Sequence, residues 1–311
     1  MLYLVGCGPL SIEYARVFKA QNRNFEVIGR GNTSADKFEK ATGIKPKLNG
    51  IEKFLRVNKI QERSEFIIVT GTEALMIALK AVLVAGASKV LVEKPAAVSM
   101  EELLANQAFL KPYLDRVFVA YNRRFYASVL ETERLIQNDG GLRSMHFEFT
   151  EWAHKVEPLD KPTVVKNNWF FANSSHVIDT AFMFAGRPRY WSNYSKKGNI
   201  NWHDKVVFSG AGITEKSVIF SYLADWESSG RWSIELLTNN RRIYLRPLEA
   251  IYIQRKGKLD LEHHLFDDNL DTTYKPGLYL QVKAFLSNED ARLLTLRSQI
   301  ENVNDIYLNF L

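Results

Sequence analysis

The sequence predicts an α/β protein with a parallel, doubly wound sheet in its first part and an open, mostly antiparallel sheet in its second. Over the first 121 residues, short apolar runs alternate with helix-length segments, an order typical of parallel strands joined by crossover helices. From residue 122 onward, strand-like runs follow one another at hairpin spacing, which indicates antiparallel pairing. We therefore expect one domain at residues 1–121 and a second, α+β domain at residues 122–311, since this length fits about two domains.

The composition is that of an ordinary soluble globular protein, with 46% hydrophobic and 24% charged residues. A single cysteine, Cys7, excludes an internal disulfide and favours a reducing, cytoplasmic compartment. The amino terminus lacks the basic segment of a signal peptide, and no apolar run is long enough to span a membrane. The net charge of +6 is modest, and the basic residues are scattered. It suits an anionic small molecule, and we expect neither a nucleic-acid nor a membrane partner.

The first eleven residues predict a strand, a tight turn and the start of a helix. The apolar run at residues 1–5 is followed by Gly6-x-Gly8-x-x-Ser11. Glycines at the first two positions allow a sharp turn and close approach to a ligand, and the N–H groups at the helix start favour a pyrophosphate. Pro9 fits the first helical turn, where no N–H is needed. The pattern predicts a dinucleotide site, although Ser11 replaces the third glycine, and an ordinary strand-to-helix turn would look the same.

The end of the second predicted strand, residues 25–29, bears on the choice of cofactor. NAD-type sites place Asp or Glu about 20 residues after the glycines to bind the ribose 2′-hydroxyl, whereas this chain has Gly29 and Arg30 there. An arginine pairs well with a 2′-phosphate. We therefore expect NADP as cofactor, with NAD as the alternative; Arg30 could also be a solvated loop residue.

The rest of the first domain continues the alternation of strands and helices. We expect strands at residues 66–70, 89–93 and 117–120, and helices at residues 35–41, 51–58, 73–84 and 99–110. A capping box, Ser99-x-x-Glu102, starts the last of these helices. The carboxyl ends of parallel strands face the cofactor crevice. The expected dinucleotide contacts are Gly6, Gly8, Pro9, Leu10, Arg30, Thr70, Gly71, Glu93 and Lys94.

Four motifs in order carry a family resemblance: Gly6-x-Gly8-x-x-Ser11, Glu93-Lys94-Pro95, Tyr121-Asn122-Arg123-Arg124-Phe125 and His176-Val-Ile-Asp179. Together they resemble the Gfo/Idh/MocA oxidoreductases, the glucose-fructose oxidoreductase and inositol dehydrogenase family, over nearly the whole chain. The resemblance implies a Rossmann domain, an α+β domain with an open sheet, and hydride transfer between nicotinamide and a sugar or polyol carbon. It also implies that Lys94 reaches the cofactor and the reacting hydroxyl, and that His176 is a general acid/base.

The chemistry of these two side chains agrees with such roles. Oxidation of a secondary alcohol needs a group that removes the hydroxyl proton and a donor that holds the developing oxyanion. A nearby nicotinamide can lower the pKa of a lysine such as Lys94, and histidine titrates near neutrality. A lone helix histidine is also a common packing residue. Asp179 could orient His176 or could simply favour the start of its helix.

One position departs from the family pattern. Relatives commonly carry an aspartate four residues before the histidine, where this chain has Ala172. The departure puts an inositol-type substrate in doubt, while Asn173 can still bond a sugar hydroxyl. We expect substrate contacts from Asn122, Arg123, Asn173 and His176, although an interdomain salt bridge is an equal alternative for Arg123. The adjacent His263 and His264 lack partners at metal-ligand spacing, so we expect a surface pair and no metal.

In the second half we expect helices at residues 128–137, 175–184, 279–286 and 294–308, and strands at 144–152, 206–209, 217–222, 231–237 and 242–245. The second half has few helices to cover a sheet that includes Val218, Phe220 and Trp232. We therefore expect a homo-oligomer, a dimer or tetramer, formed through the open sheet face.

The function expected from the sequence is an NADP-preferring oxidoreductase that acts at a secondary hydroxyl or ketone of a sugar, polyol or nucleotide sugar. Two alternatives remain: a non-catalytic dinucleotide-binding regulator on the same fold, and a reductase of a non-sugar substrate such as a diol or pyrrole pigment.

Overall fold

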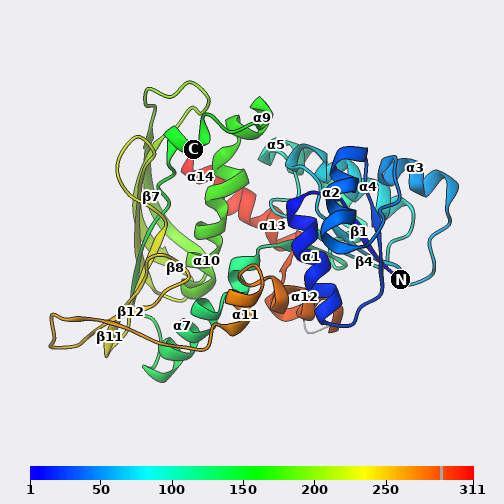
Figure 1. The fold of residues 1–311 in the computed structure, drawn as a ribbon. Coiled ribbons are helices and arrows are strands. Elements are labelled where there is room, and N and C mark those ends of the chain that lie inside the picture. The colour runs from blue at the N-terminus through cyan, green and yellow to red at the C-terminus, as the bar shows by residue number, and fades with distance from the viewer. Residues whose placement is uncertain (288–289) are drawn as a thin grey trace. The chain divides into compact units, whose positions relative to one another are not determined.

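The computed structural model describes residues 1–287 and 290–311, which form two compact units (Figure 1). The first unit comprises Met1–Tyr121 and Thr273–Asn302, and the second comprises Asn122–Thr272 and Val303–Leu311. The boundary after Tyr121 lies where the sequence placed it. A continuous second domain at residues 122–311 is not observed, because the segment 273–302 packs with the first unit and supplies both a strand and helices to it.

The first unit is built on a six-stranded sheet in the order β14-β5-β4-β3-β1-β2. All neighbouring strands are parallel except β14, which runs antiparallel to β5. The core strands are buried along nearly their whole length, as expected for a parallel sheet covered on both faces. This confirms the predicted Rossmann-like half. The strands are β1 (Leu2–Val5), β2 (Phe25–Ile28), β3 (Glu65–Ile68), β4 (Lys89–Glu93), β5 (Val117–Ala120) and β14 (Leu294–Thr295).

Local signals start and end the helices of this unit. Pro9 occupies the first turn of α1, Gly43 ends α2 with a positive φ, and Ser99 Oγ accepts a hydrogen bond from Glu102 N–H at the start of α5. The predicted helix at residues 99–110 is interrupted at Asn106. The helices are α1 (Pro9–Ala20), α2 (Asn32–Thr42), α3 (Gly50–Val57), η1 (Thr72–Ala74), α4 (Leu75–Val84), α5 (Met100–Ala105), α6 (Gln107–Leu110), η2 (Lys111–Tyr113), α12 (Leu278–Ser287), η5 (Asp290–Arg292) and α13 (Leu296–Asn302).

The second unit is built on an eight-stranded sheet in the order β13-β12-β11-β10-β6-β9-β8-β7. Neighbouring strands are antiparallel except β6 and β9, which are parallel. The mostly antiparallel sheet confirms the prediction. Its strands are β6 (Ser144–Glu148), β7 (Pro188–Lys196), β8 (Val207–Thr214), β9 (Ile219–Asp225), β10 (Ser233–Leu237), β11 (Arg241–Leu245), β12 (Tyr252–Arg255) and β13 (Leu261–His263).

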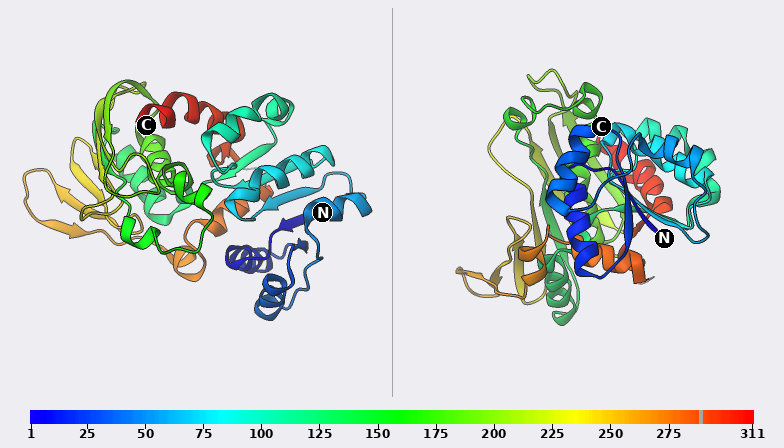
Figure 2. Two further views of the ribbon diagram at one scale, coloured as in Figure 1. Left: turned by 90° about the horizontal axis from the view of Figure 1, so that it is seen from above. Right: turned by 45° about the vertical axis from the view of Figure 1, so that its right-hand side comes forward.

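Helix α10 packs against β6 and β10 and covers one face of this sheet (Figures 1 and 2). Phe147 of β6, for example, meets Phe182 of α10 edge to face, with ring centroids 5.6 Å apart. The remaining helices of the unit are η3 (Asn122–Phe125), α7 (Ala127–Asn138), α8 (Ala153–Val156), α9 (Thr163–Asn167), η4 (Phe170–Ser174), α10 (Ser175–Ala185), α11 (Asn269–Thr273, whose last residue belongs to the first unit), η6 (Val303–Tyr307) and α14 (Leu308–Phe310).

The opposite face of the second sheet is open. Val218, Phe220 and Trp232 are at most 5% exposed and lie on the covered side. Strand side chains alternate between faces, and the open face instead presents large exposed side chains. These are Tyr190, Tyr194, Ile219 and Leu223.

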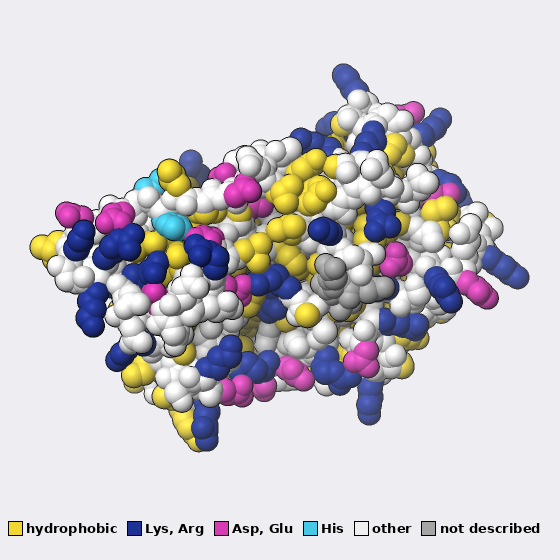
Figure 3. All heavy atoms as spheres, turned by 90° about the horizontal axis from the view of Figure 1, so that it is seen from below, with side chains coloured by type: hydrophobic (Ala, Val, Ile, Leu, Met, Phe, Trp, Pro, Cys, Tyr) yellow, Lys and Arg dark blue, Asp and Glu magenta, His cyan; other side chains and the backbone are white. Residues whose placement is uncertain are grey.

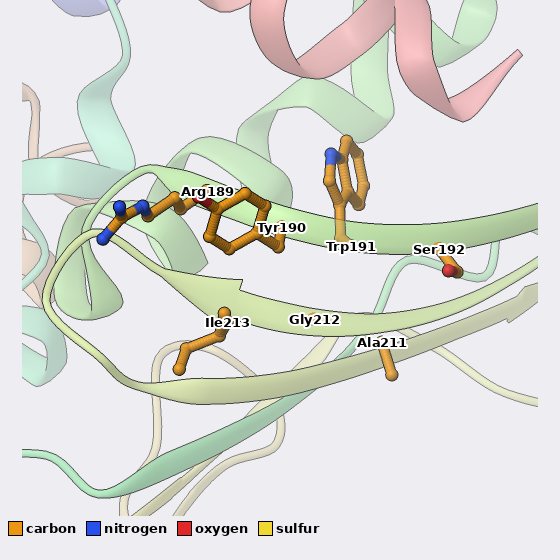
Figure 4. Close-up of a pocket in the computed structure, with 7 residues that line it drawn as sticks. All are labelled: Arg189, Tyr190, Trp191, Ser192, Ala211, Gly212 and Ile213. Carbon is orange, nitrogen blue, oxygen red and sulfur yellow. The ribbon is translucent and has the colours of Figure 1, made fainter.

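A shallow pocket of about 540 Å³ lies at β7 and β8, where Gly212 of β8 has no side chain. In Figure 4 the Trp191 ring points to the side opposite Ala211 and Ile213, which shows this alternation directly. Trp191 packs inward against Phe182 and Phe220.

Two further properties concern the surface charge and the length of the apolar helices. On the face drawn in Figure 3, lysine and arginine side chains are dispersed among acidic ones and form no continuous tract. Across residues 1–287 and 290–311, no helix is long and apolar enough to cross a membrane.

Candidate functional site

The glycine turn after β1 has the backbone geometry that a close ligand approach requires. Gly6 has a φ of 120°, and a Cβ there would collide with the carbonyl oxygen of Val69 at the end of β3. Only glycine fits such a position without strain. Gly8, by contrast, precedes the first residue of α1 and has open space where a side chain would be. The turn therefore presents backbone at the start of α1, where the helix dipole favours an anion.

This turn forms one wall of a pocket of about 440 Å³ within the first unit. Five of the predicted dinucleotide contacts line it: Gly6, Gly8, Arg30, Thr70 and Gly71. The pocket thus gathers the carboxyl ends of β1, β2 and β3, as expected for a parallel sheet that binds a dinucleotide. The other predicted contacts do not line it; Pro9 and Leu10 begin α1, and Glu93 and Lys94 lie at the end of β4 and just beyond.

At the end of β2 the pocket has no room for the acid of an NAD-type site. A Cβ on Gly29 would lie 2.7 Å from Cys7 Sγ, so the cysteine fills the space that a side chain at this position would need. Burial raises the pKa of the Cys7 thiol, which fits a packing group. Arg30 and Ser34 line the pocket beside the first turn of α2, a turn that contains no acid.

Two carboxylates that the sequence analysis did not weigh also line the pocket. Glu52 lies on α3, and Glu73 lies in the 3₁₀ turn η1 before α4. Gly71 leaves space for Glu73, because a Cβ on Gly71 would collide with its carboxylate. Such acids can accept hydrogen bonds from ribose hydroxyls. A sequence signal for Glu73 existed, since it directly follows the strand end at Thr70 and Gly71.

The Glu93-Lys94-Pro95 turn is held by buried hydrogen bonds from the returning segment of the first unit. Tyr14 Oη donates to Glu93 Oε1 at 2.8 Å, and Gln281 of α12 donates to Tyr14 Oη at 3.1 Å. On the other side of the lysine, Gln299 of α13 donates to the carbonyl oxygen of Pro95 at 3.2 Å. Burial raises the pKa of the Glu93 carboxyl. Residues on both sides of Lys94 are therefore fixed by side chains from three different helices.

In the second unit, His176 occupies the first turn of α10 and is 5% exposed, with its ring 6.2 Å from that of Trp232. The preceding turn, η4, includes Ala172 and the two polar residues after it. Asn173 Nδ2 donates to both oxygens of Glu151 at 3.0 Å, and Ser174 Oγ donates to Oε1 at 2.8 Å. A buried carboxylate therefore lies against the turn that leads into His176, although it comes from a different element than the aspartate of relatives.

Asp179 has a partner that the sequence analysis did not foresee. Its two carboxylate oxygens accept hydrogen bonds from Arg124 Nε and Nη2 at 2.7 and 2.6 Å, and its side chain is 1% exposed. A bidentate guanidinium–carboxylate pair of this kind fixes both side chains. Asp179 therefore ties α10 to η3, the 3₁₀ turn that contains Arg124.

The same turn carries Asn122, which is buried, and Arg123, which is half-buried. The guanidinium of Arg123 lies over two rings, 4.6 Å from the centroid of Trp232 and 5.7 Å from that of Tyr126. The second unit is described in full, and none of its carboxylates lies within ion-pair distance of Arg123. Within this unit, Arg123 is held by aromatic faces and not by a salt bridge.

The sequence analysis missed Glu151, Arg231 and Trp232 as members of this group. Glu151 follows the alternating strand β6, so its place at a strand end was a usable signal. Arg231 precedes β10, and no pattern near it distinguishes it from other surface arginines. In the structure, three side chains lie near the indole ring of Trp232. They are His176 and Arg123, which were predicted, and Arg231, which was not.

The pair His263 and His264 does not form a cluster of metal-binding groups. His263 is exposed, and His264 Nε2 lies 2.7 Å from Glu131 Oε1. In residues 1–287 and 290–311, no three His, Cys, Asp or Glu side chains are grouped so that they could hold a metal ion. Glu131 also pairs with Arg134, and these partners lower the pKa of its carboxyl to about 2.

The fold and the dinucleotide-type pocket define a class: two-unit proteins with a Rossmann half and a second, mostly antiparallel α+β half. No family model and no curated protein matches the chain. Solved structures do match at the level of the fold. One is UDP-N-acetylglucosamine 3-dehydrogenase from Acidithiobacillus ferrooxidans, with a TM-score of 0.69 and 12% sequence identity, over 99% of this chain and 96% of that one.

Two further solved structures have a similar fold. An oxidoreductase from Agrobacterium radiobacter, in complex with NAD⁺, L-tartaric acid and magnesium, has a TM-score of 0.74 and 12% identity over 99% of this chain and 95% of its own. Biliverdin reductase from Synechocystis sp. PCC 6803, in complex with biliverdin and NADP⁺, has a TM-score of 0.71 and 12% identity over 99% and 97%. The resemblance to Gfo/Idh/MocA-type oxidoreductases is thereby confirmed at the level of the fold.

Proposed function

We propose that the protein is an NAD(P)-dependent oxidoreductase that transfers a hydride at a secondary hydroxyl or ketone of a sugar, polyol or nucleotide sugar. The observation that carries the proposal is the pocket at the ends of β1, β2 and β3, whose glycine turn leaves room for a ligand at Gly8. The similar structures include a UDP-N-acetylglucosamine dehydrogenase and an NADP⁺-bound reductase, which supports the same class of reaction.

In this proposal the first unit binds the cofactor. The start of α1 receives the pyrophosphate, and Arg30 with Ser34 receives the 2′-phosphate of NADP. Similar structures hold NAD⁺ or NADP⁺, so the preference for NADP is our inference from Arg30 and from the space that Cys7 occupies beside Gly29. A nicotinamide held there would supply the hydride chemistry, as acceptor or donor.

The protein's own groups manage the proton and the developing charge. We assign His176 the exchange of the substrate's hydroxyl proton, because an imidazole titrates near neutrality. We assign Lys94 the stabilisation of the oxyanion, because an ammonium aimed at developing charge lowers the barrier. Asn173 and Asn122 are the proposed partners of further substrate hydroxyls. The hydrogen bonds to the Glu93 side chain and to the Pro95 carbonyl, on the two sides of Lys94, support its role, since catalytic groups must be held in one geometry.

A second candidate function is a non-catalytic dinucleotide-binding regulator, favoured by Ala172, which stands where relatives carry a carboxylate. Glu151 weakens this alternative, because it supplies a buried carboxylate beside Asn173 and Ser174. A third candidate function is a reductase of a non-sugar substrate, which the similarity to biliverdin reductase supports.

Single-turnover oxidation of bound NADPH, measured by the loss of its absorbance with a panel of keto sugars, tests the proposal. We expect Lys94→Ala and His176→Ala to slow the step by about 10²- to 10⁴-fold. The matched controls Lys53→Ala and His263→Ala change exposed residues and should react at the wild-type rate.

The affinity for NADPH is measured in parallel by fluorescence. His176→Ala should retain it, because His176 belongs to the second unit. Equal rates in all five proteins would contradict the assignment of the two catalytic groups. NADPH binding without oxidation of any panel member, followed by a cofactor-dependent change in assembly, would instead support the regulator.

A further inference from the structure

Two guanidinium groups share one indole ring in the second unit. The Cζ atoms of Arg123 and Arg231 lie 4.6 and 4.9 Å from the ring centroid of Trp232, a side chain only 5% exposed. Arg231 also lies 4.9 Å from the ring of Trp152. Cation–π contacts of this length hold a guanidinium flat against a ring and leave its N–H edges to bind another group. Two guanidinium groups therefore lie against the same ring.

The carboxylates in contact with Arg123 and Arg231 do not balance the two positive charges. Within the second unit, all of which the structure describes, the carboxylate within ion-pair distance of these two arginines is Glu151, whose Oε2 lies 3.7 Å from Arg231 Nη1. Asn173 and Ser174 already donate three hydrogen bonds to that carboxylate. Burial raises the pKa of the Glu151 carboxyl.

One nitrogen of the Arg123 side chain is left without a hydrogen bond. Its Nε is buried and has no hydrogen-bond partner in the structure. The groups that face it electrostatically are Tyr126, Glu249, Glu151 and Arg231, and burial lowers its pKa. A guanidinium withdrawn from water without a hydrogen-bonded anion is costly to the fold. Such a group is typical of a site whose counter-ion arrives with a ligand.

We propose that Arg123 and Arg231, held on Trp232, form an anion site that binds a carboxylate or phosphate group of the substrate. A planar guanidinium matches both groups with two parallel N–H···O bonds. The substrate would then be a sugar acid, a phosphorylated sugar or a nucleotide sugar, and a neutral sugar or polyol would leave Arg123 unsatisfied. The inference that an anion binds here depends only on this geometry. The inference that the anion is part of the substrate rests on the proposed function.

Calorimetric titration of the full-length protein with malonate and with inorganic phosphate tests anion binding without any turnover. NADP⁺ is present in excess, so that the phosphate sites of the first unit are filled. We expect saturable binding of at least one probe, weakened about tenfold or more in Arg123→Gln and in Arg231→Gln, since each loses a charge-assisted bond. Arg231 is 45% exposed, so its variant should fold even if the first does not.

Three controls make the result specific. Arg242→Gln removes an exposed arginine that also lies over a ring, that of Tyr244, and should bind like the wild type. Arg123→Lys retains the charge and loses the fork, and should recover only part of the affinity. Arg30→Ala reports binding in the dinucleotide pocket. Equal affinity in wild type and both glutamine variants, or a loss seen only in Arg30→Ala, would overturn the proposal, as would the absence of saturable binding.

Kinetics with matched substrates then separates the two sources of the anion. Rates with glucuronate, glucose 6-phosphate and glucose identify a carboxylate, a phosphate or neither as the preferred group. A preference for an anionic member that disappears in Arg231→Gln supports the site as a substrate site. Anion binding without turnover of any sugar would leave the site intact and refute the proposed function, whereas faster turnover of glucose than of both anions would refute the substrate assignment.

Discussion

Replacing Arg30 by alanine should change the choice between NADP and NAD more than it changes dinucleotide binding as a whole. Arg30 lines the pocket beside Ser34, at the start of a helix without an acid in its first turn. A charge-assisted bond to phosphate contributes about 1.5–3 kcal/mol. Because Arg30 is exposed, solvent screens the pair. We therefore expect a contribution just below this range, about 1.4 kcal/mol, which is a factor of about ten in affinity.

The assay is calorimetric titration of wild type and Arg30→Ala with both cofactors. NADP⁺ should bind about tenfold more weakly to the variant, and NAD⁺ should bind within about twofold of wild type. Arg23→Ala, which removes another exposed arginine of the same unit, is the matched control. Raising the salt concentration should narrow the wild-type preference, because the contact is screened.

A second variant tests the same reasoning from the opposite direction. Ser34→Asp places an acid in the first turn of α2, where it can bond ribose hydroxyls and repel a 2′-phosphate. It should favour NAD⁺. If the wild type already binds NAD⁺ more tightly, the argument from Arg30 is refuted, and Glu52 or Glu73 of the pocket becomes the better candidate for the ribose contact.

Three further predictions concern stability, assembly and positioning. Arg124→Met leaves Asp179 buried without its bidentate partner and should lower the free energy of unfolding by about 3–5 kcal/mol, measured by urea denaturation; an unchanged midpoint would contradict this. Tyr194 is 75% exposed on the open sheet face, so we expect a wild-type dimer in sedimentation velocity and a monomer for Tyr194→Glu; a monomeric wild type would remove the basis of this prediction. Gln299→Leu should slow single-turnover hydride transfer while NADPH affinity stays unchanged, because it releases the Pro95 carbonyl beside Lys94; a rate equal to wild type would exclude positioning by Gln299.

The five parallel strands of the first sheet could be predicted because each is a short apolar run with turn residues at both ends. In the second sheet the pattern is weaker. Strand β7 (Pro188–Lys196) was not predicted, since tyrosine, serine and asparagine alternate along it and one face is open to solvent. The predicted helix at residues 294–308 begins instead with β14, because Leu294 and Thr295 pair with β5. An apolar dipeptide does not reveal a partner almost 180 residues away.

The residues of the candidate sites also fall into those that could be predicted from the sequence and those that could not. Motifs that are local in sequence, such as the glycine turn and Glu93-Lys94-Pro95, could be recognised because their spacing reflects one turn of backbone. The arginine pair on Trp232 could not, because η3 supplies Arg123 and the segment before β10 supplies Arg231. Tertiary packing alone brings them to one ring. The absence of an aspartate at Ala172 was visible in the sequence, whereas the carboxylate of Glu151 beside the same turn was not.

Residues 273–302 belong to the first unit, and their helices have a role there that the sequence did not suggest. Gln281 of α12 and Gln299 of α13 are fully buried glutamines, and a leucine at either position would have no polar group to satisfy. Gln281 bonds the Tyr14 hydroxyl that holds Glu93, and Gln299 bonds the Pro95 carbonyl. Buried polar groups of this kind fix a geometry more than they add stability. The Glu93 side chain and the Pro95 carbonyl, on the two sides of Lys94, therefore depend on α12 and α13. Both helices follow the whole second sheet in the chain, so the lysine turn can take its final form only after the second unit has been synthesised.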